Sequence, residues 1–173
     1  LDLCTGSGCI GIAMAVHQPD WRVDIADISA EALALARENI AFQHVEDRVE
    51  AIQSDLFTGL DGRRYDLIVS NPPYVTEDEY AALPGEYAHE PRLGLTAGAD
   101  GLDICLRILA EAPEHLTEDG LLIVEVGESE RALGALLPEV PFVWIEFKVG
   151  LMGVFAIERR DLVEHAQAIR AAL

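Results

Sequence analysis

Strand-like and helix-like segments alternate along this chain, and that alternation constrains the fold more than any other feature of the sequence. Predicted strands lie near residues 1–4, 22–26, 49–52, 65–70, 120–126, 142–147 and 153–158. Predicted helices lie near residues 9–17, 30–42, 100–115 and 129–137, and a terminal amphipathic helix is expected over 160–173. Such alternation predicts an α/β fold with a doubly wound, mostly parallel seven-stranded sheet.

The last two predicted strands are separated by too few residues for a crossover, so they should form an antiparallel hairpin at the edge of the sheet. At 173 residues and 50% apolar content, the chain can bury roughly 70% of its unfolded surface, which suits one three-layer domain. The longest irregular stretch, residues 75–98, is expected to be a functional loop that faces the substrate. Within it, His89 and Glu90 are either substrate contacts or, more simply, solvated loop residues.

A buried-strand sequence, Tyr65–Ser70, is followed at once by Asn71-Pro72-Pro73-Tyr74. Because proline fixes φ and cannot donate to a ladder, the strand must end with Asn71 at its carboxyl end, where open α/β sheets place ligands. The Asn71 side-chain carbonyl and the Pro72 backbone carbonyl can accept both hydrogens of a substrate NH2 group, while the Tyr74 ring stacks on the flat group. The tetrapeptide is therefore suited to methylation of a planar nitrogen, and a rigid turn is the alternative interpretation.

The opening segment, residues 1–11, is typical of a strand, a glycine-rich turn and a helix start. Gly6 and Gly8 permit close approach of a ligand to the backbone, and with Gly11 they match G-x-G-x-x-G. The glycines alone do not choose between a nicotinamide cofactor and S-adenosylmethionine. Asp2 favours S-adenosylmethionine, because an acid at the end of the first strand can bind the ammonium of a methionine moiety, directly or through water, and would sit poorly beside a pyrophosphate.

Two further aspartates follow predicted strands. Asp27 follows the second strand at the spacing expected of a residue that binds ribose hydroxyls, and Ser29 is better placed than Asp27 to cap the next helix. Asp55, after the third strand, can accept the adenine amino group, although a plain turn aspartate fits its spacing almost as well. These acids, the glycines and the Asn-Pro-Pro-Tyr motif occur in strand order at the ends of four successive strands, which is more specific than any single member.

With these residues in this order, the chain resembles the class I S-adenosylmethionine-dependent methyltransferases and, among them, the HemK/PrmB protein-glutamine methyltransferases. The resemblance extends over essentially all 173 residues. The segments Glu86–Leu95 and Gly98–Gly101 look like the active-site loop of the PrmB branch. That branch methylates a glutamine of a large-subunit ribosomal protein, whereas its sister branch methylates the glutamine of release-factor GGQ loops.

The motifs and the resemblance together assign two sets of residue roles. The cofactor-binding set is Asp2, Gly6, Gly8, Asp27, Asp55 and Asn71. The substrate-binding set is Asn71, Pro72, Pro73 and Tyr74, with Asn71, Pro72 and Tyr74 as the catalytic members. The resemblance also implies a small helical domain ahead of residue 1, so residues 1–173 are expected to be the catalytic domain of a longer protein.

Charge and cysteine content indicate which partners and location to expect. The net charge of −19 disfavours nucleic acid, whose binders usually present a basic face, and suits a lysine- and arginine-rich ribosomal protein; a generally acidic proteome is the alternative. Three cysteines without C-x-x-C spacing indicate reduced thiols, and no metal site is predicted. No apolar run approaches 18 residues, so a cytoplasmic location without a membrane segment is expected.

Other functions remain open alternatives. A release-factor glutamine methyltransferase differs from the first choice only in its active-site loop. An amino-adenine nucleic-acid methyltransferase would use the same tetrapeptide, but with a basic target-recognition segment that this sequence lacks. A nicotinamide-dependent oxidoreductase would use the same glycines and would give Asn-Pro-Pro-Tyr no role. A non-catalytic cofactor-binding module is the fourth alternative.

Overall fold

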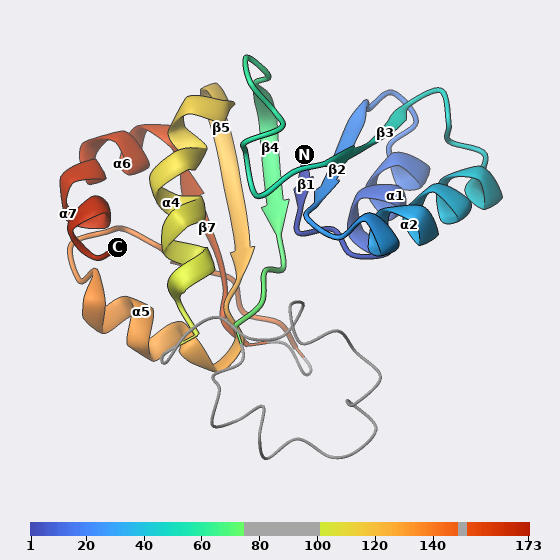
Figure 1. Ribbon diagram of the computed structural model, residues 1–173. Helices are drawn as coiled ribbons and strands as arrows, with labels where there is room; N and C mark the ends of the chain where they lie inside the picture. The colour runs from blue at the N-terminus through green and yellow to red at the C-terminus, as the bar shows by residue number, and fades with distance from the viewer. Residues whose placement is uncertain (75–100, 149–151) are drawn as a thin grey trace.

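The seven-stranded sheet that the sequence predicts is present in the computed structural model, which describes residues 1–74, 101–148 and 152–173 (Figure 1). The strands are β1 (Asp2–Leu3), β2 (Val23–Asp27), β3 (Val49–Gln53), β4 (Tyr65–Ser70), β5 (Leu116–Glu125), β6 (Val143–Trp144) and β7 (Val154–Glu158). Their order across the sheet is β3-β2-β1-β4-β5-β7-β6. The first five pair in parallel, and β7 is antiparallel to both β5 and β6, as expected of an edge hairpin. The strand order reverses between β1 and β4, which is where such sheets bind ligands.

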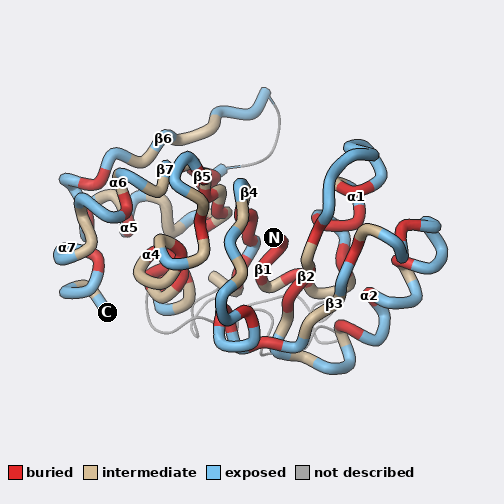
Figure 2. The backbone as a smooth tube through the Cα atoms, turned by 90° about the horizontal axis from the view of Figure 1, so that it is seen from above, coloured by how far each residue is buried: buried red, intermediate tan, exposed pale blue. Residues whose placement is uncertain are grey.

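Helices cover both faces of the sheet. They are α1 (Cys9–His17), α2 (Ala30–Gln43), α4 (Asp103–His115), α5 (Glu130–Leu136), α6 (Arg159–Glu164) and α7 (Ala166–Ala171). In Figure 1, α1 and α2 lie on one side of the strands, and α4, α6 and α7 lie on the other. Side chains of a strand alternate between faces, so Ile25 of β2 joins the core under α1 and α2, while its neighbour Ala26 joins the larger core under α4. Figure 2 shows buried residues along the central strands and exposed residues around the periphery.

One predicted helix boundary is confirmed and other boundaries differ. Ser29 caps the start of α2 as predicted, because its Oγ accepts a hydrogen bond from the Ala32 nitrogen at 3.1 Å. The expected single helix over 160–173 is wrong: it is divided into α6 and α7 at His165, whose backbone leaves the helical conformation at φ −98° and ψ 11°. The Asp161 carbonyl is contacted both by the His165 backbone nitrogen at 3.0 Å and by its ring nitrogen Nδ1 at 2.8 Å. Strand β5 begins four residues early, because its first residue, Leu116, already pairs with β4 across an irregularity in the ladder.

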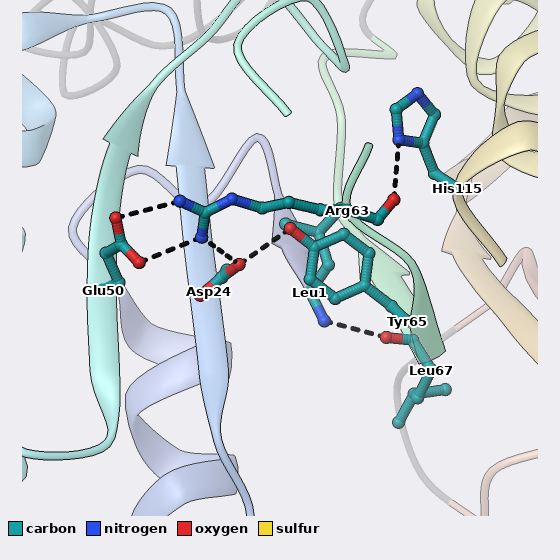
Figure 3. Close-up of polar contacts among 7 residues, drawn as sticks. All are labelled: Leu1, Asp24, Glu50, Arg63, Tyr65, Leu67 and His115. Carbon is teal, nitrogen blue, oxygen red and sulfur yellow. Dashed lines mark hydrogen bonds and ion pairs between the residues drawn. The ribbon is translucent and has the colours of Figure 1, made fainter. Parts of the chain in front are cut away.

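A cluster of polar side chains joins the strands at their amino-terminal ends (Figure 3). The Arg63 guanidinium reaches Asp24 of β2 at 2.7 Å and Glu50 of β3 at 2.9 Å. The Tyr65 hydroxyl donates to the same Asp24 oxygen at 2.8 Å. Burial, followed by this hydrogen bond and then by the Asp24 charge, raises the pKa of the phenol. We call these four residues the Arg63 cluster. It fixes β2, β3 and the start of β4 at the edge opposite the predicted ligand site.

The carboxyl ends of the central strands are aligned in one row. Leu3 of β1 is in register with Ala26 of β2 on one side and with Ser70 of β4 on the other, and Ser70 is in register with Val124 of β5. The Ser70 hydroxyl also donates to the Leu3 carbonyl at 2.7 Å. The residues that immediately follow this row are therefore brought to a single edge of the sheet.

Candidate functional site

The glycine-rich turn between β1 and α1 forms one wall of the candidate site. The Thr5 nitrogen donates to the Ala26 carbonyl at 3.0 Å, and the Gly8 nitrogen donates to the Thr5 carbonyl at 3.0 Å, so the turn folds back over the end of β2. Gly8 has φ +87°, and a Cβ there would lie 2.6 Å from the Ile12 side chain. The left-handed backbone conformation therefore favours glycine at this position, and a side chain would also require the end of the Ile12 side chain to move.

Asp2 lies beneath this turn and is almost entirely buried, at 1% exposure. One carboxylate oxygen accepts hydrogen bonds from the Gly11 nitrogen at 2.8 Å and from the Thr5 hydroxyl. The other oxygen, Oδ1, is buried without a hydrogen-bond partner among the described residues. Burial raises the pKa of Asp2 despite these two bonds. An unpaired buried carboxylate oxygen is costly, and it marks a place where a donor or an ordered water fits.

Asp27, the last residue of β2, holds the same turn from the other side. Its Oδ2 accepts from the Gly6 nitrogen at 2.8 Å, and its Oδ1 accepts from the Ser29 nitrogen at 2.9 Å. The carboxylate is therefore fixed between the turn and the start of α2. Each oxygen keeps a further lone pair, because a carboxylate has about four acceptor sites.

Asp55 follows β3 and is half exposed, with 49% of its side chain accessible. Its Oδ1 is 3.1 Å from Arg107 Nη2 of α4, and Arg107 Nε also lies 3.8 Å from Glu111 of the same helix. Burial raises the pKa of Glu111, whereas the Arg107 charge lowers it. Asp55 is thus an oriented side chain, held by an ion pair that the sequence did not reveal.

The Asn-Pro-Pro-Tyr motif begins directly at the carboxyl end of β4. Asn71 is exposed, Pro72 is buried, and Pro73 and Tyr74 are partly buried. The strand ends at Ser70, as the two prolines predict. The exposed Asn71 amide and the buried proline beside it therefore lie at the same edge of the sheet as the glycine-rich turn that Asp2 and Asp27 hold.

Tyr74 is held by β5, the strand next to β4. Its hydroxyl donates to Glu125 Oε1 at 3.2 Å. Burial, followed by the Glu125 charge, raises the pKa of Tyr74 to about 12. The phenol is therefore neutral at neutral pH and serves as a donor.

Sequence reasoning missed three supporting side chains, namely Thr5, Arg107 and Glu125. Glu125 did carry a signal, because it is an acid at the end of an apolar strand, the position for which Asp2 and Asp27 were selected. Arg107 carried none, because it lies inside an amphipathic helix 52 residues away from Asp55. Its partner could only be identified from the packing of α4 beside the end of β3.

Some predictions concern residues outside the described ranges. The PrmB-like segments Glu86–Leu95 and Gly98–Gly101, apart from Gly101 itself, fall there, as do His89 and Glu90. Among the described residues, no group of three or more His, Cys, Asp or Glu side chains is arranged to hold a metal ion. Within the same residues, no helix has the length and apolar character needed to cross a bilayer.

Known proteins match the chain over most of its length. A family model described as the methyltransferase small domain matches residues 1–84. The ribosomal protein uL3 glutamine methyltransferase of Xanthomonas campestris pv. campestris is 65% identical over 169 residues, covering 98% of this chain and 54% of that protein. The protein of the same name from Xylella fastidiosa strain Temecula1 is 62% identical over 171 residues, covering 99% of this chain and 54% of that protein. The chain therefore spans about half the length of the curated relatives that it matches.

A solved structure shows the same fold. A methyltransferase from Pyrococcus furiosus superposes with a TM-score of 0.66 at 20% sequence identity, covering 91% of this chain and 73% of that chain. At this identity the likeness concerns the fold alone, which is the Rossmann-like fold of the methyltransferases.

Proposed function

We propose that this chain, a class I methyltransferase of the family that includes the ribosomal protein uL3 glutamine methyltransferases, methylates the side-chain amide nitrogen of a glutamine in uL3. We assign this activity to residues 1–173 as a catalytic domain. The observation that carries the proposal is the alignment of strand ends, which brings the glycine-rich turn, with Asp2 and Asp27, and the Asn-Pro-Pro-Tyr motif to one edge of the sheet.

S-adenosylmethionine is the proposed methyl donor, and when bound it supplies an electrophilic methyl group on a sulfonium. The buried, unpaired Oδ1 of Asp2 supports a cationic donor nearby, directly or through water, and this fits the ammonium of a methionine moiety. The turn at Gly6 and Gly8 then offers backbone to the ligand. A Cβ at Gly6 would meet nothing within 4 Å, so this part of the turn has open space beside it.

The remaining acids suit the nucleoside part of the cofactor. Asp27 keeps acceptor capacity after its bonds to Gly6 and Ser29, and we propose that it accepts the ribose hydroxyls. Asp55 uses Oδ1 for Arg107, and we propose that its other oxygen accepts the adenine amino group. Both carboxylates are oriented by protein groups in advance, which lowers the cost of ordering them on binding.

The substrate amide is assigned to the motif after β4. The Asn71 side-chain carbonyl and the Pro72 backbone carbonyl accept the two amide hydrogens, Pro73 keeps the turn rigid, and Tyr74 packs against the flat amide. An amide nitrogen is a weak nucleophile because its lone pair is delocalised. Two carbonyl acceptors aim this nitrogen and favour the positive charge that develops on it, so positioning and electrostatics supply the catalysis.

The charge of the chain supports a basic partner. The sequence contains 12 Lys and Arg residues and 31 Asp and Glu residues, which gives the net charge of −19. A field of this sign attracts lysine- and arginine-rich proteins and repels phosphate backbones. Among substrates that present a planar NH2 group, a ribosomal protein is therefore favoured over duplex DNA.

Side-by-side methyl transfer assays test the proposal. The gene product that contains residues 1–173 is incubated with labelled S-adenosylmethionine and with uL3, a peptide-release factor or duplex DNA. Label in uL3, located on a glutamine by mass spectrometry, is the expected result. Transfer to release factor alone would assign the chain to the sister activity, and transfer to DNA alone would overturn the substrate class.

Calorimetric titration tests the cofactor separately. S-adenosylhomocysteine is expected to bind residues 1–173 with measurable heat, and NAD is expected to give none. Saturation by NAD without binding of S-adenosylhomocysteine would contradict the methyl donor proposed here and would favour an oxidoreductase.

A further inference from the structure

We infer that Glu125 is a positioning residue for the proposed methyl transfer, because it fixes the orientation of the Tyr74 ring. The inference rests on the proposed function and adds to its active site a residue outside the Asn71–Tyr74 motif. The Tyr74 hydroxyl, in the segment that follows β4, donates a hydrogen bond to Glu125 Oε1 of the neighbouring strand β5 at 3.2 Å.

Glu125 is mounted on a rigid part of the sheet. It is the last residue of β5, and that strand is flanked by β4 on one side and by β7 on the other (Figure 1). Val124 is in register with Ser70 of β4, and Glu125 itself is in register with Val154 of β7. The carboxylate therefore projects from the same row of strand ends that presents Asn71. Pairing with β7 holds its backbone, and the preceding residue, Val124, is paired with β4 as well.

The chain that follows Glu125 supports the Tyr74 ring directly. Gly127 has φ +52°, and a Cβ there would lie 2.7 Å from Tyr74 Cε2. No side chain fits between this backbone and the ring, so the ring packs against the Gly127 backbone itself. A bond at the hydroxyl and a backbone contact at the ring edge together restrict both torsions of the Tyr74 side chain.

A second glycine supports the first. A Cβ on Gly153 would overlap the Gly127 backbone, and the Val126 nitrogen donates to the Gly153 carbonyl at 2.7 Å. The start of β7 is thus packed behind the turn that contacts Tyr74. Because Gly153 packs against the Gly127 backbone, the turn at Gly127 cannot move away from Tyr74, and the ring has a fixed surface behind it.

The chemistry of the pair suits orientation. A carboxylate acceptor gives a stronger hydrogen bond than a neutral one, and a neutral phenol has a single proton to donate. With that proton directed to Glu125, the Tyr74 ring presents an apolar surface to the flat amide held by Asn71 and Pro72. Loss of Glu125 would leave the ring free to rotate away while cofactor contacts at Asp2 and Asp27 stay in place.

Steady-state kinetics on four variants test the inference. Glu125→Ala removes the acceptor, Glu125→Gln keeps an acceptor without charge, and Tyr74→Phe removes the donor; the fourth is the double variant Glu125→Ala/Tyr74→Phe. Glu118→Gln is the matched control, because Glu118 is an exposed acid at the other end of the same strand. kcat and KM for uL3 and the affinity for S-adenosylhomocysteine are measured on the gene product that contains residues 1–173.

A positioning role predicts a specific pattern. Glu125→Ala should lower kcat about 10-fold or more, with KM and S-adenosylhomocysteine affinity within about 3-fold of the parent. Glu125→Gln should recover most of the loss. The double variant should be no slower than the worse single variant, because both single changes break the same hydrogen bond. Glu118→Gln should match the parent.

Other patterns would overturn the inference. Unchanged kcat in Glu125→Ala would remove Glu125 from the active site, and multiplied losses in the double variant would show that the two residues act independently. A joint loss of kcat and cofactor affinity would indicate a structural role only. Absence of uL3 methylation by the parent contradicts the proposed function instead, so the two failures are distinguishable.

Discussion

The Asp27 carboxylate accepts a hydrogen bond from the Gly6 nitrogen at 2.8 Å, although the two residues lie 21 positions apart in the chain. The bond joins the end of β2 to the turn that precedes α1. A side chain proposed to bind ribose therefore also shapes the turn proposed to approach the methionine moiety. The two functions are coupled, because loss of the carboxylate removes a ligand contact and loosens the turn.

Replacement of Asp27 by Ala should weaken S-adenosylhomocysteine binding by about 1.5–3 kcal/mol, the usual cost of losing a charged hydrogen bond. Calorimetric titration measures the effect. Asp20→Ala is the control, since Asp20 is an exposed acid outside the site and its loss changes the charge equally. An affinity equal to the parent in Asp27→Ala would show that the residue only shapes the turn.

Replacement of Gly11 by Ala should destabilise the fold by about 1–3 kcal/mol through overpacking. The added Cβ would overlap the Ile25 side chain and lie 3.0 Å from Asp2 Cβ, so α1 would have to move away from the sheet. Denaturant unfolding measures the change. Gly134→Ala is the matched control, because no atom lies within 4 Å of its new Cβ and alanine favours a helix interior by about 0.5–1 kcal/mol. Equal stability of the two variants would contradict the packing argument.

Replacement of Asn71 by Ala should reduce glutamine methylation about 100-fold or more, by analogy with the loss of one preorganised polar group. Affinity for S-adenosylhomocysteine should stay within a few-fold, because the acids and the turn are untouched. Methyl incorporation into uL3 and calorimetry on the same preparation separate the two effects. Gln43→Ala removes an exposed amide at the end of α2 and should leave both unchanged. A parental rate in Asn71→Ala would exclude this residue from the mechanism.

Stability at alkaline pH should depend on Tyr74. Its pKa is raised to about 12 in the folded chain, above the ordinary value of 10, so the folded state retains the phenolic proton to higher pH than the unfolded state. Folding stability should therefore fall as pH rises from about 10 to 12, with the full contribution present below that window. Unfolding free energies across this range should decline more steeply for the parent than for Tyr74→Phe. Parallel curves would contradict the burial of this phenol.

The order of elements and the edge hairpin were predicted from the sequence, because apolar periodicity and short connections encode them locally. The aligned strand ends followed from the same reasoning. The division at His165 was not predicted, since it depends on the backbone conformation of this one residue, which no apolar periodicity encodes. The early start of β5 was not predicted either, because pairing with β4, and not local propensity, determines where that strand begins.

The members of the candidate site were easier to predict than the contacts between them. Asp2, Asp27 and Asn71 were selected because each is placed at or near the end of a strand, and the sheet brings them to one edge. That Asp2 leaves one oxygen buried and unpaired is a property of the packed turn, which no spacing rule predicts. The bond between Tyr74 and Glu125 spans 51 residues and depends on the neighbouring positions of β4 and β5. Their roles in binding and catalysis stay predictions until the variants are measured.

The Arg63 cluster stands at the amino-terminal edge of the sheet and the glycine-rich turn stands at the opposite edge, so we expect the turn to open without loss of the cluster's contacts. The turn is joined to the sheet mainly by bonds to two aspartates, whereas the cluster connects β2 and β3 through side chains. We therefore expect the Gly6 amide, which donates to the Asp27 carboxylate, to exchange with solvent without unpairing of these strands. Hydrogen exchange at the turn then reports a local opening that costs less than global unfolding.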